Sequence, residues 1–197
     1  MLKKKTMDIL GKDPIQYYNK ETAKKYHRSG AFRRIQYKIT RRALELLQAK
    51  KDTKIIDLGC GTGFSLDILE DEGFEARGID IAPEMIKFAK EKGHIVQVAD
   101  IRNLPFEAES FDYALSISAL QWTKEDTQKE YAAYAKEIYR ILKKEGKAII
   151  HFYPQSELEF ETAIQMFKEA KFQVECIVDK GASHQKADRK FLLLSKK

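Results

Sequence analysis

The stretch IIDLGCGTGF, residues 55–64, decides the fold of this 197-residue chain. Two β-branched residues and an acid run into glycines at positions 59, 61 and 63, a pattern typical of a buried strand that enters a tight turn and then a helix. Glycine suits this turn because the backbone takes φ values that side chains resist and because a ligand can approach the bare main chain. The stretch therefore predicts a nucleotide-binding corner.

Two acids accompany the glycines. Asp80 follows Gly63 by 17 residues, in GIDIAPEM, where it would close a second strand and accept hydrogen bonds from both hydroxyls of a ribose. Asp57 precedes Gly59 by two residues, and its charge would repel a pyrophosphate but attract a cationic or amino group. The spacing is GxGxG, whereas dinucleotide-binding proteins carry GxGxxG. This spacing disfavours NAD binding. The acids at both expected positions equally disfavour a glycine turn that serves only the geometry of the chain.

The composition indicates a cytoplasmic protein with one core. Hydrophobic residues make up 43% of the chain, but no apolar run reaches the roughly 18 residues of a membrane span, and the N-terminus lacks a secretory signal. Cys60 and Cys176 have neither a disulfide-framework spacing nor a metal-ligand spacing. We expect no membrane span, no bound metal and a cytoplasmic location.

The net charge of +6 is unevenly distributed. Residues 1–50 hold 14 Lys and Arg against 4 Asp and Glu, whereas residues 51–197 hold 22 against 26. We expect a basic arm and helix at 1–50 that packs on a core at 51–197, the two forming a single domain overall. The basic excess favours a phosphate-rich partner. A solvated helix face with a basic tail explains it equally well.

Strands and helices are predicted to alternate along the chain. Strands are expected at 54–58, up to Asp80, and at 94–100, 113–120, 148–153, 172–179 and 190–195. Helices are expected at 14–29 (as a short helix or an ordered arm), 32–49, 64–72, 83–92, 125–143 and 157–170. This alternation implies an α/β fold with a parallel sheet.

The corner together with its two acids resembles the class I S-adenosylmethionine-dependent methyltransferases, whose ligand carries a sulfonium, an ammonium and a free ribose. The resemblance implies a Rossmann-like sheet of seven mostly parallel strands, helices on both faces and an antiparallel last strand reached through a hairpin at 180–189. It also implies S-adenosylmethionine as cofactor. The residues implied to contact it are Asp57, Gly59, Cys60, Gly61 and Gly63 beside the methionine portion, Asp80 at the ribose, Ile81 and Met85 at the adenosine, Asp100 at the adenine amino group with Ile101 nearby, and Ser116 toward the sulfonium.

Two further segments are predicted to form the acceptor pocket. SISALQW, residues 116–122, lacks the Asn/Asp-Pro-Pro-Tyr/Phe sequence of enzymes that methylate amino or amide nitrogens. Within it, Gln121 and Trp122 are acceptor-pocket candidates, although Trp122 also fits a core aromatic. HFYP, residues 151–154, adds Tyr153, because ligands bind at the carboxyl edge of open α/β sheets. His151 fits a core group better than a base.

Five segments together resemble the small-subunit rRNA guanine-N(7) methyltransferases of eukaryotes and their archaeal relatives. They are YYNKETAKKY, RIQYKITRRALELL, SISALQW, HFYP and VDKGASHQKADRKFLLLS. The resemblance implies rRNA or a small-subunit precursor as partner. It also implies a small zinc-binding activator protein that pairs with a sheet edge, for which residues 94–99 are the candidate unless another segment covers them. Guanine N7 carries no proton, so transfer to it needs alignment and desolvation but no general base.

Two alternatives stay open at this stage. A similar ALQW occurs in small-molecule methyltransferases of the biotin or quinone pathways, so the acceptor could be a small acyl or quinone compound. A ribosome-assembly factor whose catalysis is dispensable would use the same fold to bind RNA and a partner.

Overall fold

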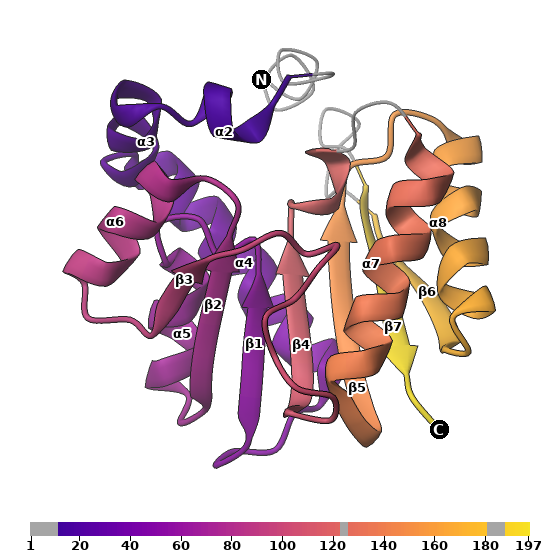
Figure 1. Ribbon diagram of the computed structural model, residues 1–197. Coiled ribbons are helices and arrows are strands. Elements are labelled where there is room, and N and C mark those ends of the chain that lie inside the picture. Colours follow the sequence, from indigo (N-terminus) through magenta and orange to yellow (C-terminus); the bar gives the residue numbers. More distant parts are fainter. Residues whose placement is uncertain (1–11, 123–125, 181–187) are drawn as a thin grey trace.

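The computed structural model describes residues 12–122, 126–180 and 188–197. Within these residues, seven strands form one sheet in the order β3-β2-β1-β4-β5-β7-β6 (Figure 1). Strands β1 to β5 pair in parallel, and β7 runs antiparallel to both β5 and β6. The predicted mostly parallel sheet with an antiparallel last strand is therefore confirmed. The strands are Lys54–Leu58 (β1), Glu75–Asp80 (β2), Val96–Val98 (β3), Phe111–Ile117 (β4), Leu142–Phe152 (β5), Gln173–Asp179 (β6) and Arg189–Ser195 (β7).

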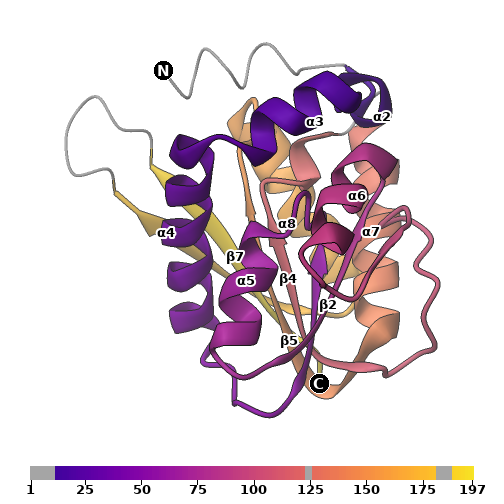
Figure 2. The same cartoon turned by 90° about the vertical axis from the view of Figure 1, so that its left-hand side faces the viewer.

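Helices cover both faces of the sheet, as Figure 2 shows. Helices α4, α5 and α6 lie on one face, and α7 and α8 lie on the other. The helices are Pro14–Tyr17 (α2), Lys20–His27 (α3), Gly30–Leu47 (α4), Phe64–Asp71 (α5), Pro83–Glu91 (α6), Thr127–Ile141 (α7) and Glu157–Glu169 (α8), with a 3-10 turn at Leu120–Trp122 (η1). No helix among the described residues is long and apolar enough to cross a membrane.

Strand β1 shows why its sequence is continuously apolar instead of alternating between apolar and polar residues. Ile55 belongs to the hydrophobic cluster under α4 and α5, whereas the next residue, Ile56, belongs to the cluster under α7 and α8. Both side chains are fully buried. A strand that is covered on both faces reads as a continuous apolar run, which is typical of parallel sheets.

Several element boundaries differ from the predicted ones. The helix expected at 14–29 is divided at Asn19, whose side-chain oxygen accepts hydrogen bonds from the backbone N–H groups of Glu21 and Thr22 and so begins α3. Strand β5 begins at Leu142 instead of residue 148, because an irregular pairing opposite β4 takes up the predicted KKEGK turn. Strand β3 has only three residues, and β4 ends at Ile117. The β6–β7 pairing confirms the hairpin, but residues 181–187 of its connection lie outside the described residues.

The N-terminal helices close one end of the sheet. Helices α2 and α3 lie beyond the carboxyl ends of the parallel strands (Figure 1), and α4 descends along the face of the sheet with Ile39, Ala43 and Leu47 buried against it. The basic segment therefore packs directly on the core, and residues 1–11 lie outside the described residues.

Candidate active site at the carboxyl edge of the sheet

A cavity of about 460 Å³ lies between the carboxyl ends of the parallel strands and the helices α2 and α3, residues of which line it. Its volume lies within the usual range for small-molecule and cofactor sites, roughly 300 to 1,000 Å³. The predicted site residues that line it are Gly59, Cys60, Gly61, Asp80, Ile81, Met85, Asp100, Ile101, Gln121, Trp122 and Tyr153. The glycine corner and the two predicted acceptor segments, residues 116–122 and 151–154, therefore line the same cavity.

The glycine turn is fixed to the end of β2. The N–H groups of Gly59 and Cys60 both donate to the carbonyl oxygen of Ile79 at 2.8 Å. The Asp80 carboxylate accepts hydrogen bonds from the N–H of Gly61 at 2.9 Å and from that of Ala82 at 2.8 Å. Burial raises the pKa of Asp80 to about 6, against the opposing effect of these two donors. The carboxylate is thus held rigidly in the wall of the cavity, where a ribose could meet it.

Three residues predicted to contact the cofactor do not line this cavity. Asp57 is buried, and one of its carboxylate oxygens accepts a hydrogen bond from the Ser65 hydroxyl. Gly63 faces the ring of His94, which a Cβ at Gly63 would approach to 2.5 Å. Ser116 is fully buried, and its hydroxyl donates to the carbonyl oxygen of Leu58 at 2.9 Å. The hydrogen bonds of Asp57 and Ser116 connect the strands to the helix and strand beside them, and the second carboxylate oxygen of Asp57 has no partner among the described residues. A contact of these three residues with the cofactor stays a prediction.

Asp100 lines the cavity but is held by its own neighbour. Its carboxylate accepts hydrogen bonds from the backbone N–H of Arg102 at 2.9 Å and from the Arg102 guanidinium at 2.6 to 3.0 Å. The pairing raises the pKa of Arg102, so the guanidinium stays charged. The predicted contact of Asp100 with an adenine amino group stays a prediction, now for a carboxylate whose orientation Arg102 fixes.

An aromatic cluster from the N-terminal helices forms the outer wall of the cavity. The ring centroids of Tyr17 and Tyr18 lie 5.4 and 5.3 Å from that of Trp122, and Tyr26 stacks on Phe64 at 5.6 Å. Trp122 is half-buried in the cavity wall, so it is no ordinary core aromatic. The three tyrosines are not among the site residues predicted from the sequence, although their clustering in PIQYYNKETAKKY was the available signal.

No base is available at His151. The side chain is fully buried in β5, and burial lowers its pKa to about 3, so the imidazole is neutral at physiological pH. Its ring is not part of the cavity lining. This placement agrees with the prediction that His151 is a core group.

Among the described residues, no cluster of His, Cys, Asp and Glu is suited to hold a metal ion.

The buried Asp57 makes stability depend on pH in an unusual direction. Burial raises the pKa of Asp57 from 3.8 to about 7, so the folded protein holds this proton more tightly than the unfolded chain does. The free energy of unfolding should therefore fall as pH rises from about 4 to about 7. Urea unfolding of the cofactor-free protein at pH 5 and pH 7.5 measures this change. Asp80, whose pKa is also raised, contributes in the same direction, so we expect Asp57→Asn to reduce the dependence without removing it. An unchanged dependence in that variant would contradict the assignment.

The central part of the chain matches a known domain. Residues 56–150 match the family described as a methyltransferase domain. The 18S rRNA (guanine(1575)-N(7))-methyltransferase of Saccharomyces cerevisiae is 36% identical over 176 residues, which cover 84% of this chain and 64% of that protein. The 18S rRNA (guanine-N(7))-methyltransferase bud23 of Schizosaccharomyces pombe is 32% identical over 191 residues, which cover 92% of this chain and 70% of that protein. The chain belongs to this family of 18S rRNA (guanine-N(7))-methyltransferases.

The match to a methyltransferase domain, and the similarity of the fold to a methyltransferase solved in complex with S-adenosyl-L-methionine, support S-adenosylmethionine as the cofactor of the domain. The residues present fit it, because the cavity offers a bare glycine backbone beside a fixed carboxylate at Asp80. The chain spans 64% of the length of the Saccharomyces cerevisiae relative and 63% of that of the Bos taurus relative.

Solved structures confirm the class I methyltransferase fold. The PH0226 protein from Pyrococcus horikoshii OT3 superimposes with a TM-score of 0.71 at 23% identity, covering 87% of this chain and 93% of that chain. A chain of the complex between the Haloferax volcanii Trm112 methyltransferase activator and a methyltransferase superimposes with a TM-score of 0.68 at 18% identity, covering 89% of this chain and 98% of that chain.

Proposed function

We propose that this protein transfers a methyl group from S-adenosylmethionine to N7 of a guanine in small-subunit rRNA. The observation that carries the proposal is the single cavity in which Gly61 and Asp80 face the same space as Trp122 and Tyr153. A cofactor seated at the glycine corner would lie beside an aromatic wall suited to a flat base. The names of the family members favour this acceptor over a small molecule.

The reaction needs little chemistry from side chains. S-adenosylmethionine supplies an electrophilic methyl group on its sulfonium, and guanine N7 offers a lone pair without a proton. The protein therefore has to hold the base in line and exclude water, and such alignment can contribute about 7 to 11 kcal/mol. The aromatic rings of Trp122 and Tyr17 would hold the base, and the neutral, buried His151 would take no proton.

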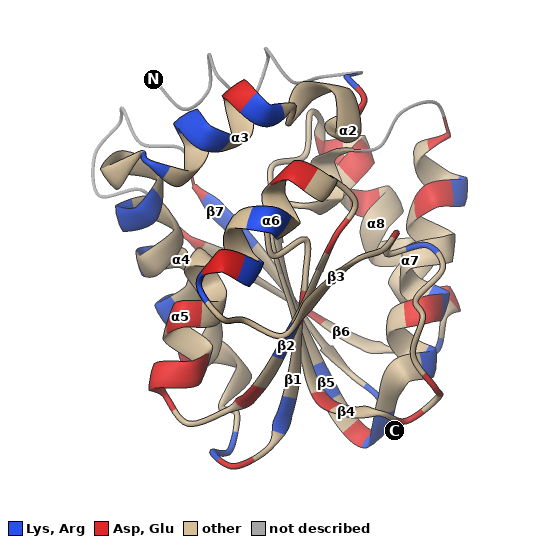
Figure 3. Cartoon of the chain, turned by 60° about the vertical axis from the view of Figure 1, so that its left-hand side comes forward, with Lys and Arg blue, Asp and Glu red and all other residues tan. Residues whose placement is uncertain are grey.

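A basic surface on α3 and α4 supports an RNA substrate. Residues 12–40 hold 8 Lys and Arg against 2 Asp and Glu, and Figure 3 shows the basic segments on these helices. Farther along α4, Arg41 pairs with Glu72, and Arg42 pairs with Asp179 at 2.9 Å, so these two arginines serve the fold. Among the described residues, Lys24, Arg28 and Arg34 are exposed and have no acidic partner. They form the surface that we assign to RNA phosphates.

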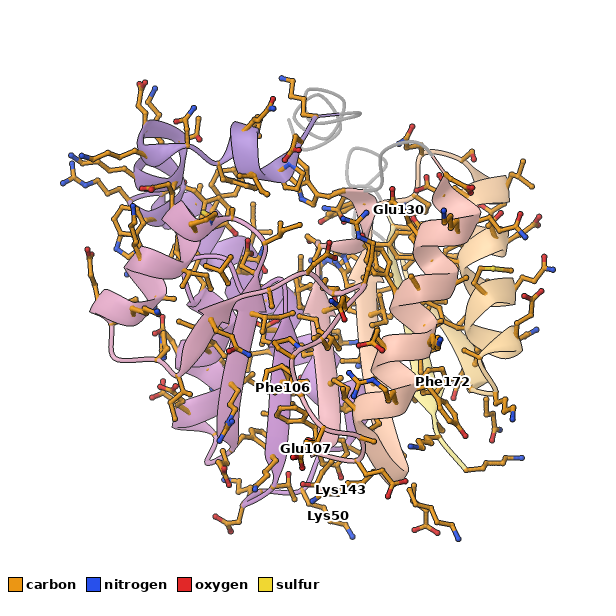
Figure 4. The ribbon with its side chains drawn as sticks, viewed as in Figure 1. Lys50, Phe106, Glu107, Glu130, Lys143 and Phe172 are labelled. Atoms are coloured by element: carbon orange, nitrogen blue, oxygen red, sulfur yellow. The ribbon has the colours of Figure 1, made fainter. Side chains whose placement is uncertain are left out.

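Replacing Lys24, Arg28 and Arg34 together by alanine should weaken RNA binding. Each lost phosphate contact should also reduce the slope of log Kd against log salt concentration by about 0.7 to 0.9. Filter binding over a salt series measures both effects. The matched control replaces Lys50, Lys51 and Lys144, which are exposed lysines. Lys50 and Lys143, the neighbour of Lys144, lie at the opposite end of the sheet from α2 and α3 (Figure 4). Equal losses of RNA affinity in both triple variants would show that the basic residues of α3 and α4 form an ordinary solvated face.

The exposed edge of the sheet supports the proposed activator. Strand β3 is an outer strand, and Ile95 and Val98 beside and within it are 62% and 49% exposed. An apolar edge strand with unpaired backbone groups is a template for pairing with another chain. The structural similarity to a chain from the Trm112 complex supports a partner of that kind, and we place its contact at residues 94–99.

The test supplies labelled S-adenosylmethionine with small-subunit RNA or precursor particles, each with and without the activator. Label in RNA is expected, and more of it when the activator is present. The biotin- or quinone-pathway alternative rests on the sequence ALQW at residues 119–122. Turnover of a small acyl or quinone acceptor without labelling of RNA would favour that alternative. We also propose that the protein is cytoplasmic, as predicted from the sequence.

A further inference from the structure

The outer side of helix α4 carries basic residues around one exposed aromatic ring. Four of its residues recur three or four positions apart and therefore share one side of the helix: Arg34, Tyr37, Lys38 and Arg41. All four are exposed, and Figure 3 shows the basic segments along this helix. Tyr37, at 48%, is the one exposed aromatic side chain among the described residues. The aromatic ring thus lies in solvent within a cationic surface.

The opposite side of α4 belongs to the core and to the cavity. Ile39 and Ala43 are buried in the hydrophobic cluster on this face of the sheet. Ile35 and Gln36 are part of the cavity lining, whereas Tyr37 is not. The docking of the helix and the shape of the cavity therefore do not depend on the ring of Tyr37, which remains available to a ligand that comes from solvent.

A neighbouring cation braces the ring of Tyr37. The guanidinium carbon of Arg41 lies 5.3 Å from the ring centroid, within the range of a cation–π contact. Arg41 is itself paired with Glu72, the residue that follows α5. The ion pair anchors the guanidinium, and the guanidinium in turn holds the ring. A ring that is already held loses little further freedom when a flat group stacks on it, which lowers the entropic cost of binding.

The charges beside the ring are available to phosphates. Among the described residues, neither Arg34 nor Lys38 forms an ion pair with an acidic side chain. Proteins that bind single-stranded nucleic acid combine such a cationic surface with aromatic rings on which bases stack. The bases of a duplex are stacked and paired inside the helix, so only an unpaired base can reach a protein ring. The surface therefore fits a single-stranded segment of RNA.

We propose that the outer side of α4 is a second RNA site, where Tyr37 stacks on an unpaired base while Arg34 and Lys38 contact the neighbouring phosphates. This inference rests on the proposed function, because it concerns the same RNA, and it adds that the RNA is single-stranded where it crosses α4. The site lies outside the cavity lining, so it holds the RNA without touching the guanine that is methylated. It contributes to RNA affinity and not to the methyl-transfer step.

RNA binding tests the stacked ring separately from the charges. The probes are a short single-stranded RNA that cannot pair with itself and the duplex of the same sequence. Tyr37→Ala should weaken binding of the single strand about 5- to 150-fold, the range of one stacked base, without changing its salt slope. Binding of the duplex should not change. Tyr37→Phe keeps the ring and should bind like the unaltered protein, whereas Lys38→Ala should reduce the salt slope by about 0.7.

The matched control is Leu158→Ala, which removes an exposed apolar side chain from α8 on the other face of the sheet (Figure 2). It should leave RNA affinity unchanged. Three results would overturn the inference: an unchanged affinity of Tyr37→Ala for the single strand, an equal loss on single strand and duplex, or an equal loss in Tyr37→Phe.

Methylation of small-subunit RNA separates the inference from the proposed function. Tyr37→Ala should raise KM for the RNA and leave kcat unchanged, because the ring contacts no reacting atom. A lower kcat at saturating RNA would place the effect of Tyr37 in the reaction and overturn the inference alone. If the unaltered protein bound the single strand through Tyr37 but methylated no RNA, the proposed function would fail while the site on α4 stood. An unaltered protein that bound no single-stranded RNA would overturn the inference.

Discussion

Replacing Gly59 by alanine should abolish cofactor binding. A Cβ at this position would lie 2.4 Å from the Cβ of Ala119, far inside any allowed contact, and the backbone has φ of +89°. The left-handed conformation costs a non-glycine residue about 1 to 2 kcal/mol, and overpacking adds about 1 to 3 kcal/mol. Relief of the clash requires the turn and the β4 exit to separate. Both segments belong to the cavity wall. The parts of the cavity assigned to the cofactor and to the acceptor would therefore be displaced together.

Two other glycines supply matched controls for Gly59→Ala. Gly73 has the same φ of +89°, but nothing lies within 4 Å of the position of its Cβ, so Gly73→Ala should cost only the backbone strain. At Gly61, a Cβ would meet the flexible end of Met85 at 3.2 Å, which predicts an intermediate loss. Titration calorimetry with S-adenosylmethionine and thermal unfolding would rank the three variants. Similar cofactor affinities in the Gly59 and Gly73 variants would contradict the proposed contact with Ala119.

Replacing Asp80 by alanine should cost about 100-fold or more in cofactor affinity. The carboxylate accepts hydrogen bonds from the N–H groups of Gly61 and Ala82 and lines the cavity where the ribose is expected. Hydrogen bonds to charged groups contribute about 1.5 to 3 kcal/mol each, and 1.4 kcal/mol is a factor of ten. The variant loses both the ribose acceptor and the anchor of the glycine turn.

The control for Asp80→Ala removes an acid elsewhere. Asp71→Ala changes the last residue of α5, which is not part of the cavity lining, and should leave cofactor affinity unchanged. Asp80→Asn keeps one acceptor oxygen and should give an intermediate loss. Calorimetry at pH 7.5, well above the pKa of about 6 at Asp80, keeps the carboxylate ionised in the unaltered protein. A loss below threefold in Asp80→Ala would contradict the ribose assignment.

The glycine corner was predictable from sequence because its requirements are local. The φ values of +89°, +55° and +81° at Gly59, Gly61 and Gly63 are a backbone property that the residue type itself signals. Asp80 was predictable for a similar reason, because the number of residues between the turn and Asp80 is enough for one helix and one strand. Its two hydrogen bonds to the backbone confirm that it belongs to the corner.

The surroundings of the residues outside the cavity lining depend on contacts between distant segments. The family resemblance placed Asp57 and Ser116 near the cofactor, whereas the structure shows Asp57 bonded to Ser65 and Ser116 bonded to Leu58 of the neighbouring strand. Whether a strand residue points toward the cavity or toward the strand beside it is set by register and twist, which one sequence does not reveal. The aromatic wall was missed for the same reason, because Tyr17 and Trp122 meet only after folding.

The position of the transferred methyl group on the RNA tests the proposed function most directly. RNA from small-subunit particles treated with the protein, S-adenosylmethionine and the activator can be cleaved with borohydride and aniline, which break the chain at 7-methylguanosine. We predict one new cleavage site at a guanine, absent from particles treated with the Gly59→Ala or Asp80→Ala variant. Labelled RNA without any such cleavage, or no label in RNA at all, would contradict guanine N7 as the acceptor.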